Sequence, residues 1–430
     1  MTTWTAWRND LPSSWVIVPL RAAADYAVSN VDKIPSEDEL PVRLCNYTDV
    51  YNNEFITPAM DFMRCTATPD EIKKFGLRIG DVVITKDSES WDDIAIPALV
   101  VKSADDLVCG YHLALLRPHP EKLDSRFLLR CLQAKMIRVY LELAANGVTR
   151  FGIPKYDIGK LPLPLPSLRE QKQIADYVER EAVRIDELVA SKRKLLELLN
   201  EKLRAFIVRA VTRGLNQPVR MKASGHAWLG EIPAHWEIKR TKRVFSERDD
   251  RSETGDEEML TVSHITGVTK RSEKDVNMFE AESNEGYKKC SPGNLAINTL
   301  WAWMGAMGIS PEEGIVSPAY HVYELSDEIL PGYVDALVRT PAFVKEVTRF
   351  STGVWSSRLR LYPEGLFEVR IPVPPMDEQK AIVAAIEKER ARTSKFETEL
   401  RRSITLLKER RTALITAAVT GEIPVSEMTK

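Results

Sequence analysis

The chain has 430 residues, of which 44% are hydrophobic and 28% charged, and its formal net charge at pH 7 is −2. This length and composition predict two to four domains with cores of their own. The start shows no basic segment followed by an apolar run, and no apolar run approaches the ~20 residues of a membrane span. The five cysteines form no C-x-x-C pair and the six histidines are scattered, so we expect a cytoplasmic protein with reduced thiols, no bound metal and no membrane contact.

The first segment, residues 1–166, is predicted to fold as a mixed α/β domain. Gly80–Thr85 has the pattern of a turn that enters an apolar strand, and Cys109–His112 lies on β-prone sequence. Residues 167–213 are then predicted to form one long helix. Prolines keep the preceding segment extended, and Ser167 with Glu170 fits a capping box. About 45 residues without Pro or Gly correspond to roughly 68 Å of helix.

A second set of the same elements follows. Ile232–Trp236 resembles Leu11–Trp15, and Gly293–Asn298 resembles Gly80–Thr85. The predicted segments are a linker at 214–230, a second mixed domain at 231–375, a second long helix at 376–421 and a tail at 422–430.

The two helices repeat each other. Residues 162–212 align with 370–420 without a gap at an offset of 208, with 18 identities in 51 positions. So long a period indicates a duplicated domain and pseudo-two-fold symmetry. Apolar residues recur at seven-residue spacing in both copies, which favours a coiled coil over separate packing of each helix on its own domain.

We expect this pair to be antiparallel, with residue i opposite 591 minus i. That register sets Glu181 beside Arg410, whereas parallel helices would set Glu181 beside Glu389. The predicted seam positions are Ile174, Val178, Glu181, Ile185, Leu188, Lys192, Leu195, Leu199, Lys202, Phe206 and Arg209, and Ile382, Ile386, Glu389, Thr393, Phe396, Leu400, Ser403, Leu407, Arg410, Leu414 and Ala417.

Net charge separates the helices from the domains. The two helices, 168–213 and 376–421, each carry +3, whereas residues 1–167 carry −3 and 214–375 carry −4. Any nucleic-acid contact must therefore use local patches.

No catalytic or nucleotide-binding motif is present in the sequence. It has no G-x-x-x-x-G-K-[ST] loop, no G-x-G-x-x-G after a strand and no N-P-P-Y tetrapeptide. Glu170 and Lys172, repeated as Glu378 and Lys380, could form half of a nuclease metal site. Their place in a first helical turn makes capping the better interpretation. The sequence thus favours binding over catalysis.

Three tracts carry a resemblance to a known family. They are G-E-I-P-A-H-W-E at 230–237, G-I-V-S-P-A-Y at 314–320, and P-x-P-x-x-x-E-Q at both 164–171 and 372–379. In this order, and over essentially the whole chain, they resemble the specificity subunits of type I restriction–modification systems. The resemblance implies an α+β fold with two target recognition domains in pseudo-two-fold arrangement, joined by two long antiparallel coiled-coil helices.

The resemblance also implies partners. Each domain would read one half of a split, asymmetric sequence in double-stranded DNA. The helices would dock two modification (methyltransferase) subunits, and restriction (motor-nuclease) subunits would complete the assembly. S-adenosylmethionine, ATP and Mg would belong to those partners, so we expect no cofactor and no catalysis in this chain.

The residues expected to contact DNA follow the two matching glycine turns or occupy matching tyrosine and arginine positions, since base reading needs donors and acceptors on loops or strands. For each tryptophan alone, core packing is the commoner role, and for the arginines a solvated surface role stays open. The predicted DNA-binding residues are Lys86, Ser88, Tyr111, Thr149, Arg150, Asn298, Trp301, Trp303, Tyr320, Trp355, Arg358 and Arg360. The residues predicted for the coiled coil and subunit docking are Glu170, Gln171, Ile174, Val178, Leu195, Leu199, Glu378, Gln379, Ile382, Ile386, Leu407 and Leu414.

The sequence leaves two other functions open. One is a coiled-coil adaptor without DNA function, and the other is a stand-alone DNA-cleaving enzyme with an unrecognised site. Salt-dependent binding to one split duplex sequence would favour recognition over both. Metal-dependent cleavage by the chain alone would indicate the enzyme.

Overall fold

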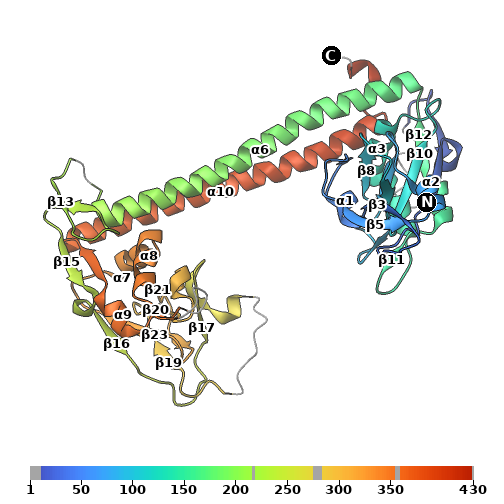
Figure 1. The fold of residues 1–430 in the computed structure, drawn as a ribbon. Helices are drawn as coiled ribbons and strands as arrows, with labels where there is room; N and C mark the ends of the chain where they lie inside the picture. The colour runs from blue at the N-terminus through green and yellow to red at the C-terminus, as the bar shows by residue number, and fades with distance from the viewer. Residues whose placement is uncertain (1–10, 216–217, 275–282, 354–358, 429–430) are drawn as a thin grey trace. The chain divides into compact units, whose positions relative to one another are not determined.

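A computed structural model of the chain describes residues 11–215, 218–274, 283–353 and 359–428 (Figure 1). It divides into two compact units, residues 1–192 with 401–430, and residues 193–400. Each unit holds one domain of strands and short helices together with part of each long helix. The predicted fold class, mixed domains with two long antiparallel helices, is confirmed.

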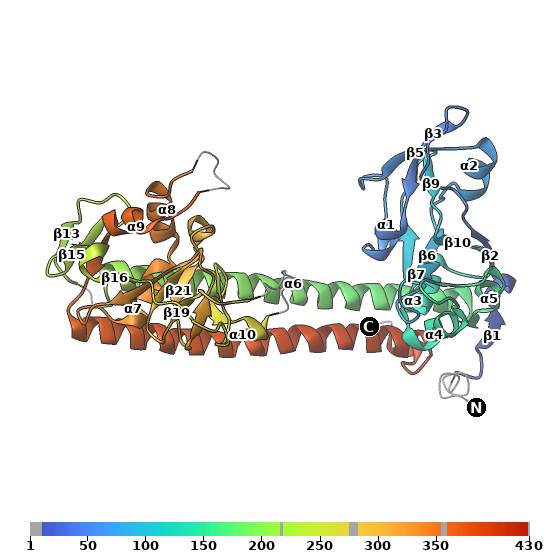
Figure 2. The same ribbon diagram turned by 90° about the horizontal axis from the view of Figure 1, so that it is seen from below.

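The first domain is built on the sheet β2-β10-β6-β8-β4, in which β4 and β8 are parallel and the other neighbours antiparallel. Both faces of this sheet are covered, as the apolar run of β6 requires. Val82 and Ile84 belong to the core that includes α3, whereas Val83 belongs to the core beneath the sheet β5-β3-β9. Figure 2 shows β5-β3-β9 at the end of the domain away from α3 and α4.

The elements of the first domain have the following bounds. The strands are β1 Val16–Pro19, β2 Ala24–Val28, β3 Leu40–Cys45, β4 Phe55–Ile56, β5 Met63–Ala67, β6 Val82–Thr85, β7 Asp87–Ser88, β8 Pro97–Val100, β9 Leu107–Cys109, β10 Leu113–Pro118, β11 Phe151–Gly152 and β12 Pro162–Leu165. The helices are α1 Tyr47–Tyr51, α2 Pro69–Phe75, α3 Ser125–Gln133, α4 Lys135–Ala144 and α5 Lys155–Lys160.

The second domain is built on the antiparallel sheet β16-β23-β20-β21. The strands are β13 Met221–Ala223, β14 Glu231–Pro233, β15 Glu237–Arg240, β16 Phe245–Arg248, β17 Leu260–Ser263, β18 Gly267–Lys270, β19 Lys288–Cys290, β20 Leu295–Ile297, β21 Met307–Ile309, β22 Gly314–Val316, β23 His321–Leu325 and β24 Arg370–Val373. The helices are α7 Pro331–Val338, α8 Pro341–Arg349 and α9 Pro363–Glu368.

The duplication extends from the helices to the domains. The order β2-β10-β6-β8 in the first unit recurs as β16-β23-β20-β21 in the second, and the pair β1-β12 recurs as β15-β24. The glycine that begins each matching turn has a positive φ, 93° at Gly80 and 89° at Gly293, a conformation that glycine adopts without steric cost. The sequence similarity between the two turns thus reflects one shared topology.

The long helices are α6, Leu168–Arg213, and α10, Met376–Val419. The predicted capping box of α6 is formed, since the Ser167 hydroxyl and backbone N–H both donate to the Glu170 carboxylate, at 2.7 and 2.9 Å. Gly214 and Gly421 follow the two helices with the same φ of +77°, as expected of helix C-termini. The domain boundaries stay a prediction. The segment proposed as a linker contains β13 and the buried Leu229, and the proposed tail buries Met428 in the first core.

The antiparallel direction is visible inside each unit, but the predicted register is wrong. In the first unit Arg411 contacts Asp186 at 3.3 Å, and in the second Asn200 donates to Glu397 at 2.6 Å. The residue numbers of both pairs add to 597 rather than 591. Glu181 instead pairs with Arg184 on its own helix, so charges at the expected seam do not set the register.

The predicted seam is also wrong by one residue in half of its positions. Ala182 and Val189 are buried, whereas Leu188 is 51% and Leu195 49% exposed. On α10 the same shift leaves Phe396 half exposed and brings the neighbouring Glu397 to Asn200. On α6, apolar residues occupy both the predicted seam positions and several of the positions one residue later, as at Leu188 and Val189. The correct frame could have been found, because it replaces the charged predicted positions Glu181, Lys202 and Arg209 with Ala182, Leu203 and Ala210.

The five cysteines are free, buried thiols. Burial raises the pKa of Cys290 to about 11, so its thiol stays protonated at neutral pH. Within the described ranges, none of the helices is long and apolar enough to cross a membrane.

Candidate nucleic-acid interface

The predicted DNA-contacting residues of the first unit gather around the loop that leaves β6. Strand β7 pairs with β11, which sets Ser88 opposite Phe151 and brings Arg150 beside the same loop. Ser88 and Arg150 line one cavity of about 510 Å3. Thr149 is exposed next to Arg150.

Asp87 organises this loop. Its carboxylate accepts from Lys86 Nζ and faces His112 Nδ1, both at 2.6 Å. Burial alone would raise the pKa of Asp87, but hydrogen bonds from Lys86 and His112 lower it below its usual value. The ring of Tyr111 lies 3.7 Å from that of His112. Lys86 and Tyr111 thus belong to the same cluster, although Lys86 is engaged by a neighbouring carboxylate.

The matching place in the second unit carries aromatic side chains. Asn298 Nδ2 donates to the Tyr320 hydroxyl at 2.9 Å, and burial raises the pKa of Tyr320. The rings of Trp301 and Trp303 are stacked, 6.4 Å apart at 14°. Trp301 is 50% exposed, so it does not have the core role that is common for tryptophan.

Three of the predicted residues fall between α8 and α9 in the sequence. Arg360 is exposed and forms a two-residue backbone bridge with Thr352. Trp355 and Arg358 lie outside the described residues.

Two tyrosines were missed by the sequence analysis. Tyr47 and Tyr51 lie one turn apart on α1, with rings stacked at 5.5 Å and 16°, and both line the cavity that holds Ser88 and Arg150. The Y-x-x-x-Y spacing directly after Asn46, the N-cap residue of α1, was the available signal. So short a helix has too little hydrophobic periodicity to be recognised from sequence.

The glutamine of each P-x-P-x-x-x-E-Q tract makes the same three hydrogen bonds in its own unit. Gln171 accepts from the backbone N–H of Asp124 at 2.8 Å and donates to the carbonyls of Lys122 and Pro166, both at 2.9 Å. Gln379 accepts from Leu330 at 2.7 Å and donates to the carbonyls of Glu328 and Pro374, both at 2.9 Å. Both side chains are fully buried. The repeated glutamine therefore fixes the start of each long helix to the segment that precedes α3 or α7.

The preceding glutamate of the tract acts beside it. Glu170 caps its helix with Ser167, and Glu378 accepts from Trp236 Nε1 at 2.9 Å and faces His235 Nε2 at 2.6 Å. A hydrogen bond from Ser167, and a further one from Trp15, lower the pKa of Glu170. Trp15 and Trp236 are the matching tryptophans of the two domain starts, so each glutamate connects the beginning of a domain with its helix.

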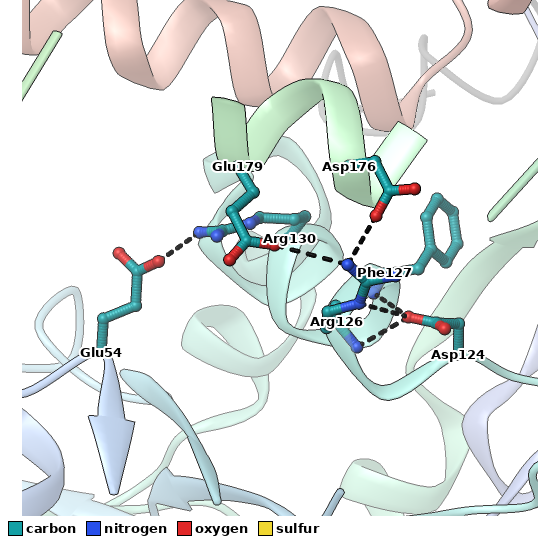
Figure 3. A network of polar contacts seen from close by, with 7 residues as sticks. All are labelled: Glu54, Asp124, Arg126, Phe127, Arg130, Asp176 and Glu179. Carbon is teal, nitrogen blue, oxygen red and sulfur yellow. Dashed lines mark hydrogen bonds and ion pairs between the residues drawn. The ribbon is translucent and has the colours of Figure 1, made fainter. Parts of the chain in front are cut away.

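A polar network attaches α3 of the first domain to α6 (Figure 3). Asp124 caps α3 by accepting from the N–H groups of Arg126 and Phe127, at 2.9 and 3.1 Å. The Arg126 guanidinium donates to Asp176 at 2.6 Å and to Glu179 at 3.4 Å, both on α6.

Glu54, just beyond α1, attaches the domain to α10. It accepts from the buried Arg130 of α3 and, at 2.6 Å, from Arg411 of α10. Burial would raise the pKa of Glu54, but the two guanidinium groups lower it below its usual value. The segment that carries Tyr47 and Tyr51 is thus fixed to the helix within this unit.

The sequence is similar to a known domain family and to known proteins. Residues 32–198 match the domain family described as type I restriction modification DNA specificity domain. The chain is 22% identical to the type I restriction enzyme MjaVIII specificity subunit of Methanocaldococcus jannaschii, over 86% of this chain and 85% of that protein. It is 21% identical to the EcoKI specificity subunit of Escherichia coli K12, over 96% and 90%.

Solved structures share the fold. The HsdS subunit of Thermoanaerobacter tengcongensis is 17% identical, with a TM-score of 0.56 over 96% of this chain and 98% of that one. A chain from a study of complex assembly and conformational transition of a type I R-M system is 16% identical, with a TM-score of 0.69 over 96% and 99%.

The chain is a type I specificity subunit. As a specificity subunit it is the DNA-recognition component, and catalysis lies in the other subunits of such a system. The residues predicted for the coiled coil and subunit docking differ in exposure. Ile174 and Val178 pack with α10 in the first core, and Ile382 and Ile386 pack with α6 in the second. Among the leucines of this set, Leu195 is exposed, and Leu199, Leu407 and Leu414 are half-buried.

Proposed function

We propose that this specificity subunit reads a bipartite, asymmetric sequence in double-stranded DNA, with each domain reading one half. The observation that carries the proposal is the repeated glutamine clamp. Gln171 and Gln379 fix two domains of the same topology to the starts of two antiparallel helices. A duplicated scaffold presents two reading surfaces of independent composition, which suits a split target.

The partners belong to the same proposal. Two modification subunits dock on the pair α6 and α10, where leucines such as Leu195 are exposed. Restriction subunits join that complex, S-adenosylmethionine, ATP and Mg act on the partners, and the assembly works in the cytoplasm. Each helix carries +3 while the domains carry −3 and −4, so basic partner surfaces neutralise part of the DNA phosphate charge.

The DNA-contacting residues named above stay predictions, and the cavity supports them for the first unit. Ser88 and Arg150 line the same cavity although they are 62 positions apart in the sequence. Convergence of polar side chains from separate loops is the usual property of a binding surface.

Mapping of methylated adenines tests the proposal. Cells that express this chain with its modification subunit should show one split motif, two short sequences with a non-specific spacer, that disappears when this chain alone is deleted. A motif without a spacer, or methylation that persists without the chain, would contradict the proposal.

A further inference from the structure

The cavity of the first unit, here called the α1 cleft, has a composition that selects among DNA features. It lies between α1, the loop after β6 and the loop before β11, and its volume is about 510 Å3. This is within the usual 300–1,000 Å3 of small-ligand pockets, and it admits part of a base pair rather than a folded protein segment.

Tyrosines form one wall of the α1 cleft. Tyr47 and Tyr51 stack on each other, and Tyr51 is 39% exposed. The Tyr51 hydroxyl donates to Asp93 Oδ2 at 2.7 Å, which orients that carboxylate on the wall. Stacked rings on one helix are stiff contact surfaces that lose little conformational entropy on binding.

Carboxylates also line the α1 cleft. Asp87 is engaged by Lys86 and His112, whereas Glu89 is exposed at the cavity edge. Among the described residues, Tyr51 donates to one oxygen of Asp93 and none donates to the other. Two carboxylates in the cleft disfavour a phosphate group and favour a ligand with N–H donors.

Arg150 supplies the complementary group. Its side chain is exposed and lines the same cavity, and in the described part of the chain no carboxylate lies within 4 Å of its guanidinium. In the major groove a C·G pair presents the cytosine N4 amino group as a donor beside the O6 and N7 acceptors of guanine. Glu or Asp accepts from cytosine N4, and Arg donates to guanine O6 and N7.

We propose that the α1 cleft reads a C·G base pair in the half-site of the first domain, with Glu89 accepting from the cytosine N4 hydrogen that base pairing leaves free and Arg150 donating to guanine. This inference rests on the proposed function, because it assumes that the first domain reads one half of a split target. It adds Tyr51, which orients Asp93, and Tyr47, which stacks on Tyr51, as positioning residues.

Methylation mapping of variants tests the assignment in the intact complex. Arg150→Ala and Glu89→Gln should each relax the requirement for one C·G pair in one half-site, with the other half-site unchanged. Arg64→Ala and Glu37→Gln, which change exposed residues of the same domain away from the cleft, should leave the motif intact.

Binding of the purified complex to synthetic duplexes gives an independent measurement. N4-methylcytosine at the assigned pair blocks one amino hydrogen, so wild-type affinity should fall roughly tenfold, while Glu89→Gln should show a smaller loss. An unchanged half-site in the Arg150→Ala and Glu89→Gln variants would overturn the inference but leave the proposed function intact.

Other outcomes separate the remaining explanations. Loss of co-purification with the modification subunit in Arg150→Ala, without a change of motif, would show that the cleft binds a protein and would overturn the inference. Absence of any methylation that depends on the wild-type chain would overturn both the inference and the proposed function.

Discussion

Two features of this molecule occur twice: the start of each long helix, and the loop that follows β6 or β20. The two helix starts are alike, whereas the two loops differ. At the helix starts, Gln171 and Gln379 make the same three bonds to matching backbone groups. At the loops, the offset that aligns Gly80 with Gly293 places Ser88 opposite Trp301. The first loop therefore lines a polar cleft, whereas the second exposes a stacked tryptophan pair.

This difference separates the two tasks of the chain. Each glutamine bonds only to backbone groups, which are present whatever the neighbouring side chains are. The same three hydrogen bonds can therefore form in both copies. The loops lie at the surface, where side chains can change with little effect on the core. A duplicated protein that reads two different half-sites requires this combination of a constant scaffold and variable loops.

Removal of the clamp should have the largest effect on stability. Gln171→Leu leaves one N–H and two carbonyl groups without their partner, so the free energy of unfolding should fall by about 3 kcal/mol, at about 1 kcal/mol for each bond. Gln379→Leu should give a similar loss in the second unit. Urea unfolding measures both, and Gln173→Leu, on the half-buried side chain two residues away, is the matched control. Unequal losses would show that the clamps are not equivalent.

The Glu54 junction is a feature of the first unit, and it should have the next largest effect. Glu54→Gln removes the charge that faces Arg130 and Arg411, and it should cost about 2 kcal/mol because Arg130 is buried. Since the pKa of Glu54 is lowered in the folded protein, this stabilisation is complete above about pH 4.5 and is lost as the pH falls through the lowered value.

Unfolding at several pH values checks this sign. The difference between wild type and Glu54→Gln should be constant between about pH 5 and 7 and should shrink below about pH 4. A difference that grows toward acid pH would contradict the pairing. The exposed Glu37→Gln should show no such dependence.

Much of this architecture could be predicted from the sequence, and the failures have physical causes. The prolines, the Ser167 cap and the two glycines predicted both long helices, because these signals are local. The predicted seam was wrong because α6 carries apolar residues at neighbouring positions along the helix. Which of them is buried depends on how the partner helix packs. The buried role of Gln171 was not foreseen, since its bonds reach the segment around Asp124, 47 residues away.

The candidate site shows the same division. Ser88 and Arg150 could be proposed from matching positions in the repeat, and the structure brings them to one cavity. Tyr47 and Tyr51 could not be proposed in this way, because α1 has no recognised counterpart in the second half of the sequence. Their place beside Ser88 depends on the packing of α1 near β6, which no local pattern encodes.

The loops themselves should have the smallest effect on stability. Arg150→Ala and Trp301→Ala change exposed side chains, so the free energy of unfolding should change by about 0.5 kcal/mol or less. Thermal unfolding of each variant measures this. A large loss for Trp301→Ala would show that the tryptophan pair supports the fold rather than a binding surface.

Methylated-adenine maps of these same two variants test the central claim, that each domain reads its own half of the target. The maps would be recorded in cells that express each variant with the modification subunit. Arg150→Ala should relax one half of the motif and Trp301→Ala the other, with the spacer unchanged in both. A substitution in one domain that alters both halves, or two substitutions that alter the same half, would contradict the claim.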